Sequence, residues 1–353
     1  MQETTGKVLM KKWLVTILVF LMMIPLAAQG LEYWTEGTDV LGSIEAYVES
    51  LTDETSPDYL PEEKRIAVFD SDGTLFGERF PTYLDTWLLI HRLAHDENYT
   101  AAESDKAWAL EAEAALLRHE AEPKSPRSGA QMAAEAFKGF TVEEYRAYAR
   151  SLMETKVAGF EGMTYGEGFF KPMVSLVRYL REKGFTVFIV SGAERNLLRE
   201  LMTGVLDQWV PPYCVLGSTF SLCATAQGDK QGRDYNITAE DEILMEGNLV
   251  SKTQKLNKVI SIIQEIGQVP VLAFGNTSGD FSMGTYVVKN GGKAYMLLCD
   301  DTDRDYGDLK VAEKFRGECE ALGFETISMK EDFATIYGED VHKVEEEALS
   351  PAA

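Results

Sequence analysis

The sequence predicts an α/β fold: a doubly wound, mainly parallel sheet with an inserted helical cap domain. Two observations predict this class. Several short apolar runs are continuous rather than alternating, as in strands that are buried on both faces of a parallel sheet. Between the first two runs lies a long segment, rich in Ala, Glu, Leu and Arg, with helical spacing and no strand-like alternation.

Each expected strand ends where polar residues begin. The apolar runs cover residues 65–70, 185–190, 269–274 and 294–299, and they lead into Asp70, Ser191-Gly192, Gly275-Asn276 and Asp300-Asp301. A helix over residues 172–183 is expected before the second run, because Pro172 opens it and Gly184 follows its end. Ligands of open α/β sheets bind beyond the carboxyl ends of the strands, so these polar residues are expected to meet at one edge.

The same patterns divide the chain into segments. We expect a signal peptide over residues 1–30, an N-terminal arm over 31–63, a core from 64–78 and 167–340, a cap over 79–166 and an acidic tail over 341–353. The cap interpretation rests on the helical spacing of apolar residues such as Trp108, Ala114 and Leu117. An insertion of this length can cover the edge of the sheet.

The first thirty residues are typical of a bacterial secretory signal. Lysines precede an apolar run over residues 13–26, and small residues follow up to Gly30. This run is shorter than the roughly 20 apolar residues of a membrane-spanning helix, which favours cleavage near Ala28 or Gly30. We therefore expect an exported protein that meets the membrane only through this segment, if the segment is not cleaved.

The charge of the chain limits its partners. Its 57 acidic residues outnumber its 34 basic residues, for a formal net charge of -23. This charge disfavours nucleic acid or an anionic membrane surface as a partner. A small anionic substrate would have to be held by local groups against the field of the whole chain.

Two carboxylates follow the first expected strand. Asp70 ends it and Asp72 stands two residues later, within the turn Ser71-Asp72-Gly73-Thr74. Asp70 can attack phosphorus and form an aspartyl phosphate, and Asp72 can protonate the leaving oxygen and then activate water. Two carboxylates facing a phosphate need a cation, which predicts Mg²⁺ as cofactor.

These residues resemble the first motif of the haloacid dehalogenase-like hydrolase superfamily, over residues 67–75. Residues 189–192 are similar to its second motif, and residues 274–280 resemble its fourth. More narrowly, the chain resembles the phosphoserine-phosphatase-like branch and an exported bacterial subgroup of it. The resemblance covers about residues 64–340 and says little about the substrate.

The resemblance implies roles for further residues. Ser191 and Gly192 would grip a phosphate oxygen, and Glu78 at the entrance to the cap would touch the leaving group. The metal site would comprise Asp70, Asp72, Asn276 and Asp280. A lysine would neutralise charge on the transferring phosphoryl group. Lys258 has the spacing of the subgroup, Lys252 is the rival at a longer spacing, and Lys255 is the third alternative.

One departure from the family pattern concerns the metal. Asn276 stands where the superfamily usually has an aspartate, so one expected charge is a neutral amide. The expected function is magnesium-dependent hydrolysis of a small phosphomonoester through an aspartyl phosphate on Asp70. The alternative is a non-catalytic protein of the same fold that binds a phosphorylated ligand or a metal.

Overall fold

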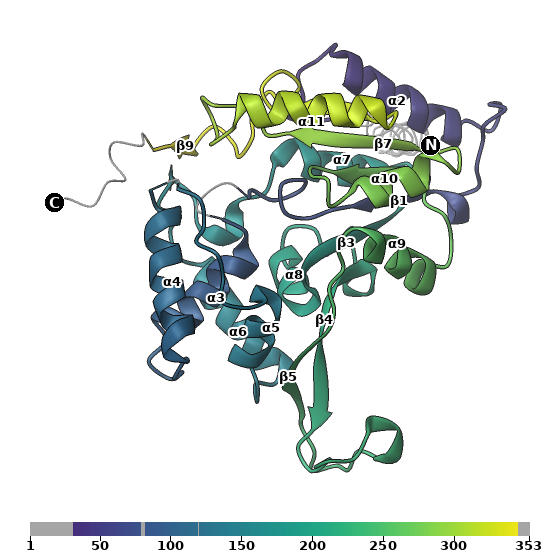
Figure 1. Ribbon diagram of the computed structural model, residues 1–353. Helices are drawn as coiled ribbons and strands as arrows, with labels where there is room; N and C mark the ends of the chain where they lie inside the picture. Colours follow the sequence, from purple (N-terminus) through teal and green to yellow (C-terminus); the bar gives the residue numbers. More distant parts are fainter. Residues whose placement is uncertain (1–30, 79–81, 119, 345–353) are drawn as a thin grey trace, which may run out of the picture. The chain divides into compact units, whose positions relative to one another are not determined.

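The computed structural model describes residues 31–78, 82–118 and 120–344, and Figure 1 shows its ribbon. The predicted signal peptide over residues 1–30 lies outside the described residues. Residues from Tyr33 onward form one compact unit, to which the following description applies. Within the described part of the chain, every helix is too short or too polar to cross a bilayer.

The sheet has seven strands in the order β5-β4-β3-β1-β6-β7-β8. All neighbouring pairs are parallel except β4 and β5, which form an antiparallel hairpin. The predicted mainly parallel sheet is confirmed, and it extends beyond the four expected strands. The strands are β1 Ile66–Phe69, β3 Thr186–Glu194, β4 Val215–Ala224, β5 Ile243–Ser251, β6 Leu272–Gly275, β7 Lys293–Leu298 and β8 Glu325–Ser328.

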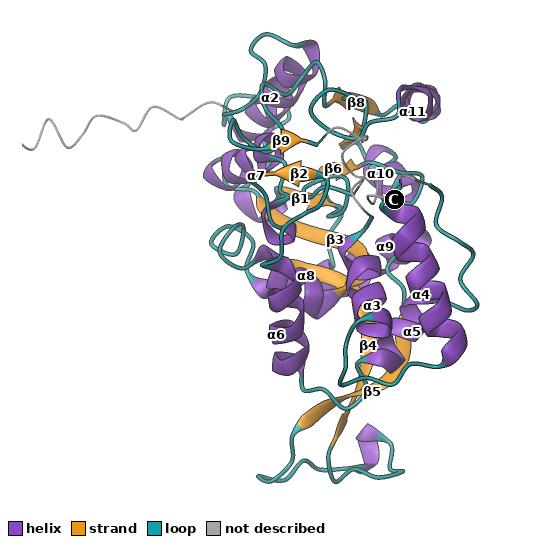
Figure 2. Ribbon diagram, turned by 90° about the vertical axis from the view of Figure 1, so that its left-hand side faces the viewer, coloured by secondary structure: helices purple, strands orange, loops and turns teal. Residues whose placement is uncertain are grey.

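The helices cover both faces of this sheet (Figure 2). From β1 the chain first moves toward β4 and later returns toward β8. Because the crossovers of parallel strands are right-handed, the two directions place helices on opposite faces. The first face carries α7 Lys171–Glu182 and α8 Arg195–Met202, and the second carries α9 Leu256–Ser261, α10 Phe281–Val288 and α11 Leu309–Ala321. The sheet is therefore doubly wound, and its direction reverses beside β1.

The central strands are held together by their own side chains. All four residues of β1 and all four of β6 are buried. Phe69 pairs in register with Phe274, which pairs with Tyr295. Their rings stack at centroid distances of 4.3 and 5.4 Å. On the opposite face, Val68 belongs to a buried cluster with residues of α10 such as Met283. Burial on both faces explains why these strands read as continuous apolar runs.

The segment predicted as an N-terminal arm contains a helix. This helix, α2 Asp39–Thr52, buries Val40, Ile44 and Val48 among its apolar residues. The hydroxyl of Ser43 in α2 lies 3.2 Å from the phenol oxygen of Tyr295 in β7. The helix α2 therefore packs on the face of the sheet that carries Tyr295. Apolar residues spaced three or four apart carry this helix, and the polar residues between them give the segment the composition of a linker.

The inserted segment forms helices, as its spacing predicts. They are α3 Leu84–Ala94, α4 Glu103–Leu116, α5 Gly129–Ala136 and α6 Val142–Met153. The expectation of no strand in this segment was wrong at its end, where β2 Phe160–Glu161 pairs with β9 His342–Lys343. The latter lies in the predicted acidic tail. Strands of two residues are too short to produce an alternating pattern.

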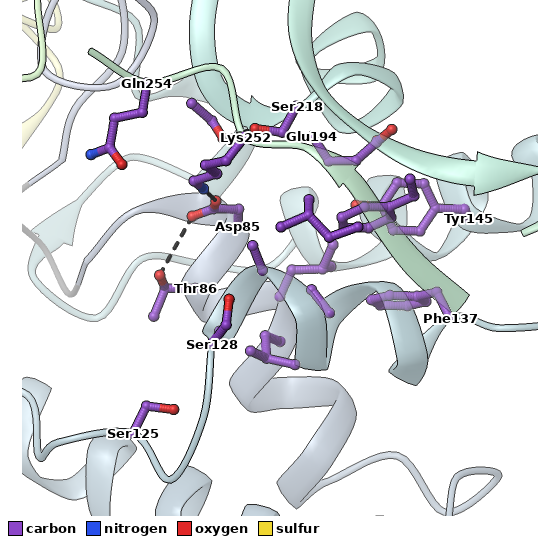
Figure 3. A pocket seen from close by; sticks show the side chains of 18 of the residues that line it. Asp85, Thr86, Ser125, Ser128, Phe137, Tyr145, Glu194, Ser218, Lys252 and Gln254 are labelled. Carbon is purple, nitrogen blue, oxygen red and sulfur yellow. Dashed lines mark hydrogen bonds and ion pairs between the residues drawn. The ribbon is translucent and has the colours of Figure 1, made fainter. Parts of the chain in front are cut away.

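Two of the contacts that fasten the cap to the core involve α5 with β5 and α6 with α8. The side-chain amide of Gln131 in α5 donates to the carbonyl of Gly247 at 3.2 Å and accepts from the amide of Leu249 at 3.0 Å. In α6, Arg146 and Arg150 both donate to the buried carboxylate of Glu200 in α8. Cap and core residues together line a cavity of about 400 Å³ (Figure 3).

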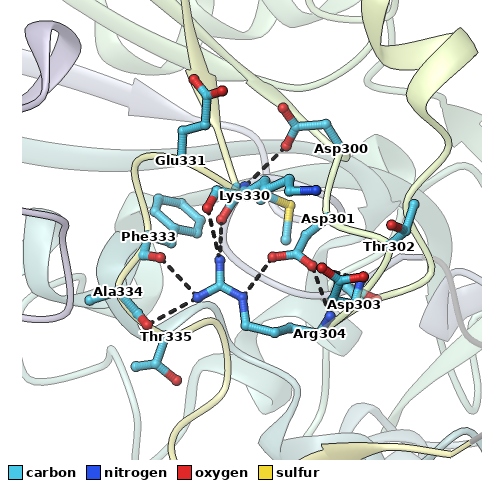
Figure 4. A network of polar contacts seen from close by, with 12 residues as sticks. Asp300, Asp301, Thr302, Asp303, Arg304, Lys330, Glu331, Phe333, Ala334 and Thr335 are labelled. Carbon is cyan, nitrogen blue, oxygen red and sulfur yellow. Dashed lines mark hydrogen bonds and ion pairs between the residues drawn. The ribbon is translucent and has the colours of Figure 1, made fainter.

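An arginine ties the end of the core together (Figure 4). Arg304 donates to Asp301 at 2.6 Å, and Asp301 is almost fully buried. The guanidinium of Arg304 also donates to the carbonyls of Met329, Phe333 and Ala334 at 2.8–3.0 Å. One planar group with five donors thereby holds the loop that follows β8.

We predict that Arg304→Lys destabilises the fold by about 2 kcal/mol, because an ammonium cannot reach carbonyls arranged around a planar fork and leaves several unpaired. Urea denaturation measures the free energy of unfolding. Arg118→Lys is the matched control, since Arg118 makes an exposed pair with Glu120 and is expected to change stability by less than about 0.5 kcal/mol. Equal effects of the two substitutions would show that other contacts hold the loop.

Candidate active site

The polar residues at the strand ends meet at one place. Asp70 follows β1, and its amide donates to the carbonyl of Phe274 at 2.9 Å, which extends the pairing of β1 with β6. Asp70, Asp72, Ser191, Gly192, Lys258, Asn276 and Asp280 all line one cavity of about 180 Å³. The site lies beside β1, where the winding of the sheet reverses. This is the position at which open α/β sheets bind ligands.

A tight turn presents the two carboxylates after β1. The carbonyl of Ser71 accepts from the amides of Thr74 and Leu75 at 3.1 and 2.8 Å. Gly73 has a φ of +74° in this turn, and a Cβ on it would lie 1.8 Å from the side-chain nitrogen of Asn276. Only glycine fits there, so the glycine allows the turn after β1 to contact the loop after β6.

Lys258 lies between two of the carboxylates. Its Nζ is 2.7 Å from Oδ1 of Asp70 and donates to Oδ1 of Asp280 at 2.5 Å. The side chain is buried, at the start of α9. Burial lowers the pKa of Lys258, but the charges of Asp280 and Asp70 outweigh it and raise the pKa. The ammonium therefore stays charged.

The two rival lysines lie elsewhere. Nζ of Lys252 is 3.8 Å from Asp85 of the cap, at the wall of the same cavity. Lys255 is exposed and is not among the residues that line the cavity. The geometry thus favours Lys258 over Lys252 and Lys255 as the lysine that acts on a phosphoryl group at Asp70.

Asp280 organises the loop that follows β6. Its Oδ2 accepts from the amides of Asn276 and Thr277, both at 3.1 Å, while Oδ1 accepts from Lys258. In this arrangement Asp280 holds the lysine and the loop, and Asn276 is the loop residue that faces the first turn. The side-chain oxygen of Asn276 accepts from the hydroxyl of Thr74 at 3.3 Å.

The serine and glycine of the second motif lie near the end of β3. Ser191 is almost fully buried. The hydroxyl of Ser218 donates to the carbonyl of Gly192 at 2.6 Å and accepts from the amide of Thr253 at 3.1 Å. This hydroxyl joins the end of β3 to the segment that carries Lys252, which fixes the backbone of the site on that side.

The site carries more negative than positive charge. Burial and the charge of Asp280 raise the pKa of Asp70 to about 6, against the opposing effect of Lys258. Burial and then the charge of Asp85 raise the pKa of Asp72 well above its usual range. In the described part of the chain, four carboxylates, Asp70, Asp72, Asp85 and Asp280, line this cavity with two ammoniums, Lys252 and Lys258, so its negative charges outnumber its positive ones.

One predicted residue, Glu78, lies apart from the other predicted site residues. Glu78 lies beside the turn at Gly73, and it is not among the residues that line the cavity. Asp85, Thr86 and Gln254 do line it, and no motif in the sequence pointed to them. Asp85 is in the first turn of α3, where an acidic residue is commonly favoured by the helix dipole, so the sequence held no specific signal for it.

A sequence model of the haloacid dehalogenase-like hydrolases matches residues 67–285, which is more than half of the chain. The chain belongs to this family. The resemblance seen in its motifs is thereby confirmed, while the exported subgroup stays a prediction. The match includes the turn after β1, the end of β3, Lys258 and the loop after β6.

Several solved structures are similar to this hydrolase-family chain. A functionally unknown protein from Anaerococcus prevotii is 14% identical, with a TM-score of 0.49 and coverage of 81% of this chain and 92% of that chain. A cytosolic 5'-nucleotidase IIIB bound to cytidine is 14% identical, with a TM-score of 0.47 and coverage of 87% and 91%. A probable phosphoserine phosphatase from Vibrio cholerae is 12% identical, with a TM-score of 0.37 and coverage of 83% and 69%. The comparison with curated protein sequences found no match.

The donor set of this family member fits a hard divalent cation. Asp70 and Asp72 supply carboxylate oxygens, and Asn276 supplies an amide oxygen beside them. Among the described residues, no three His, Cys, Asp or Glu side chains form a ready metal cluster. Mg²⁺ suits such a sparse set, since it keeps several waters and needs only one or two carboxylates from the protein.

We predict that Lys258→Met destabilises the protein by about 3 kcal/mol at neutral pH, because it leaves Asp70 and Asp280 buried without their shared counter-charge. Chemical denaturation measures the effect. Lys255→Met is the matched control, since this exposed lysine is expected to contribute less than about 0.5 kcal/mol. If the two variants are equally stable, the two carboxylates do not depend on the ammonium.

Proposed function

We propose that the chain is a phosphatase that hydrolyses a small phosphomonoester with Mg²⁺, through an aspartyl phosphate on Asp70. The observation that carries the proposal is the buried ammonium of Lys258 within 2.7 Å of Asp70, in a cavity that Asp72 and Ser191 also line. This arrangement combines a nucleophile, an acid and a cationic group at one edge of the sheet.

In the first step, a carboxylate oxygen of Asp70 attacks phosphorus. The bond between phosphorus and the ester oxygen breaks, and Asp72 gives that oxygen its proton. Asp72 stands two residues after Asp70 and lines the same cavity, which suits this role. The hydroxyl of Ser191, the amide of Gly192 and the ammonium of Lys258 would hold the phosphoryl oxygens, which is mainly an electrostatic task.

In the second step, water gives a proton to Asp72 and attacks the phosphorus of the aspartyl phosphate. The bond between Asp70 and phosphorus breaks, which releases inorganic phosphate and restores Asp70 as a carboxylate and Asp72 as the protonated acid. Asp70, Asp72 and Asn276 would hold the metal, with Asp280 positioning their loop. When bound, Mg²⁺ neutralises the carboxylates and polarises the phosphoryl group.

We predict that the purified full-length chain releases phosphate from 4-nitrophenyl phosphate with Mg²⁺, and that chelation by EDTA abolishes the release. Asp70→Asn is expected to lower kcat at least about 10³-fold, because an amide cannot form the aspartyl phosphate. Asp58→Asn is the control, since Asp58 is exposed and does not line the cavity.

Two results would contradict the phosphatase proposal. One is a wild-type protein without turnover in the presence of any divalent metal, which would instead favour a binding protein of the same fold. The other is an Asp70→Asn variant as active as the wild type. Because Asn276 stands in place of an expected carboxylate, the assay should include other divalent metals, such as Mn²⁺ and Co²⁺.

We also propose that the protein acts outside the cytoplasm, supported by the lysines, apolar run and small residues before Gly30. When the full chain is expressed in a bacterium, we expect the mature protein outside the cytoplasm, with a new N-terminus near residue 29 or 31. N-terminal sequencing of fractionated cells measures this. Replacement of Lys7, Lys11 and Lys12 by Gln should slow export, and an unprocessed cytoplasmic wild type would contradict the proposal.

A further inference from the structure

The cap cavity adjoins the site around Asp70. This larger cavity, about 400 Å³, shares part of its wall with the smaller one. The shared residues are Asp85, Thr86, Gly192, Lys252 and Gln254, four of which are visible in Figure 3 around the Lys252 to Asp85 contact. A group esterified to a phosphate at Asp70 can therefore extend past these residues into the cavity. Its volume lies at the lower end of the range for small-molecule sites.

Most of this cavity is apolar. Both cap and core contribute large side chains to it, namely Leu88, Trp108, Phe137, Tyr145, Phe220 and Leu249. Binding to such a lining is favoured when the ligand buries an apolar or aromatic group there, and it is disfavoured when the ligand buries unpaired polar atoms. The cavity thus suits a compact apolar body of an ester rather than a hydrated one.

Four of the five hydroxyls that the described residues place in the cavity wall, all except that of Tyr145, have hydrogen-bond partners given by the protein itself. Ser125 donates to the carbonyl of Arg127 at 2.5 Å, and the oxygen of Ser128 accepts from the amide of Gln131 at 3.4 Å. Ser218 bonds the backbone of Gly192 and Thr253 at 2.6 and 3.1 Å, and Thr86 bonds Asp85 at 3.4 Å. A ligand with many hydroxyls, such as a sugar, would have few free partners here and would lose its hydration.

The charges on the cavity wall are unequal. Among the described residues, the acidic side chains are Asp85, Glu122 and Glu194, and the one basic side chain is Lys252. Lys252 is paired with Asp85 at 3.8 Å. The carboxylate of Glu194 accepts from the amides of Asn196 and Leu197 and so caps α8. Glu122 remains: it lines the cavity as an exposed residue, and partial burial and then the charge of Asp85 raise the pKa of its carboxyl.

We propose that this cavity binds the organic part of the substrate and selects it by charge. The substrate is then a monophosphate ester of a compact apolar or aromatic alcohol that is neutral or positively charged. Esters that carry a carboxylate, a second phosphate or many hydroxyls are rejected. This inference rests on the proposed phosphatase activity and names the substrate class of that site.

Three phenyl phosphates of nearly equal size test the charge selection on the full-length protein. They carry a para aminomethyl, ethyl or carboxymethyl group, which is cationic, neutral or anionic at neutral pH. We expect kcat/KM for the carboxymethyl ester to be at least about 10-fold below kcat/KM for the ethyl ester. The value for the aminomethyl ester should equal or exceed the value for the ethyl ester. Glu122→Gln should lower the ratio of kcat/KM for the aminomethyl ester to kcat/KM for the carboxymethyl ester several-fold. Glu120→Gln is the matched control, since Glu120 does not line the cavity and should leave the ratio unchanged.

A cavity-filling substitution tests the location. Ala133→Phe places a ring into the cavity and should lower kcat/KM for all three phenyl esters, but not for acetyl phosphate, whose small leaving group does not reach it. Hydrolysis of acetyl phosphate reports the phosphatase activity by itself. If acetyl phosphate is hydrolysed but the three esters are equivalent, or the carboxymethyl ester is best, the charge selection is wrong and the phosphatase stands. If no compound is hydrolysed, both proposals fail.

Discussion

The site depends on one buried ammonium between two buried carboxylates. Lys258 contacts Asp70 after β1 and Asp280 after β6, so a single charge joins the ends of two neighbouring strands. Asp280 in turn binds the amides of its own loop, which brings Asn276 against the turn at Gly73. Each contact requires the others, because a carboxylate buried without its partner would be costly. The carboxylates that remain unbalanced favour the binding of a cation at this place. An anionic phosphoryl group can then bind together with that cation.

Much of this arrangement could be predicted from the sequence, because the strands are buried on both faces and end abruptly in polar residues. The apolar runs fixed the positions of Asp70, Ser191 and Asn276 at one sheet edge, since parallel strands share their carboxyl ends. The choice among three lysines could not be made this way. Lys252, Lys255 and Lys258 lie within seven positions, and only the start of α9 decides which ammonium turns inward.

The parts that sequence reasoning missed are those with weak local patterns. The helix α2 carries apolar residues at helical spacing, including Val40, Ile44 and Val48, within a segment whose other residues are polar enough to predict an arm. The hairpin β4–β5 was not anticipated as part of the sheet, although it holds the cap through Gln131 and lines the cavity with Phe220 and Leu249. Asp85 also had no distinguishing signal. The described residues that define the cavity come from seven separate elements, so no spacing along the chain could bring them together.

The pairing of β2 with β9 has a consequence for how the cap is anchored. Phe160–Glu161 ends the inserted segment, and His342–Lys343 lies close to the end of the chain. Gly162 has a φ of +81°, and a Cβ there would lie 2.3 Å from the carbonyl oxygen of Asp340, so the two backbones are in close contact. The pairing therefore closes a ring of more than 180 residues of the chain, which contains β3 to β8. A proteolytic cut before His342 would open that ring and loosen the exit of the cap, although it removes no residue of the active site.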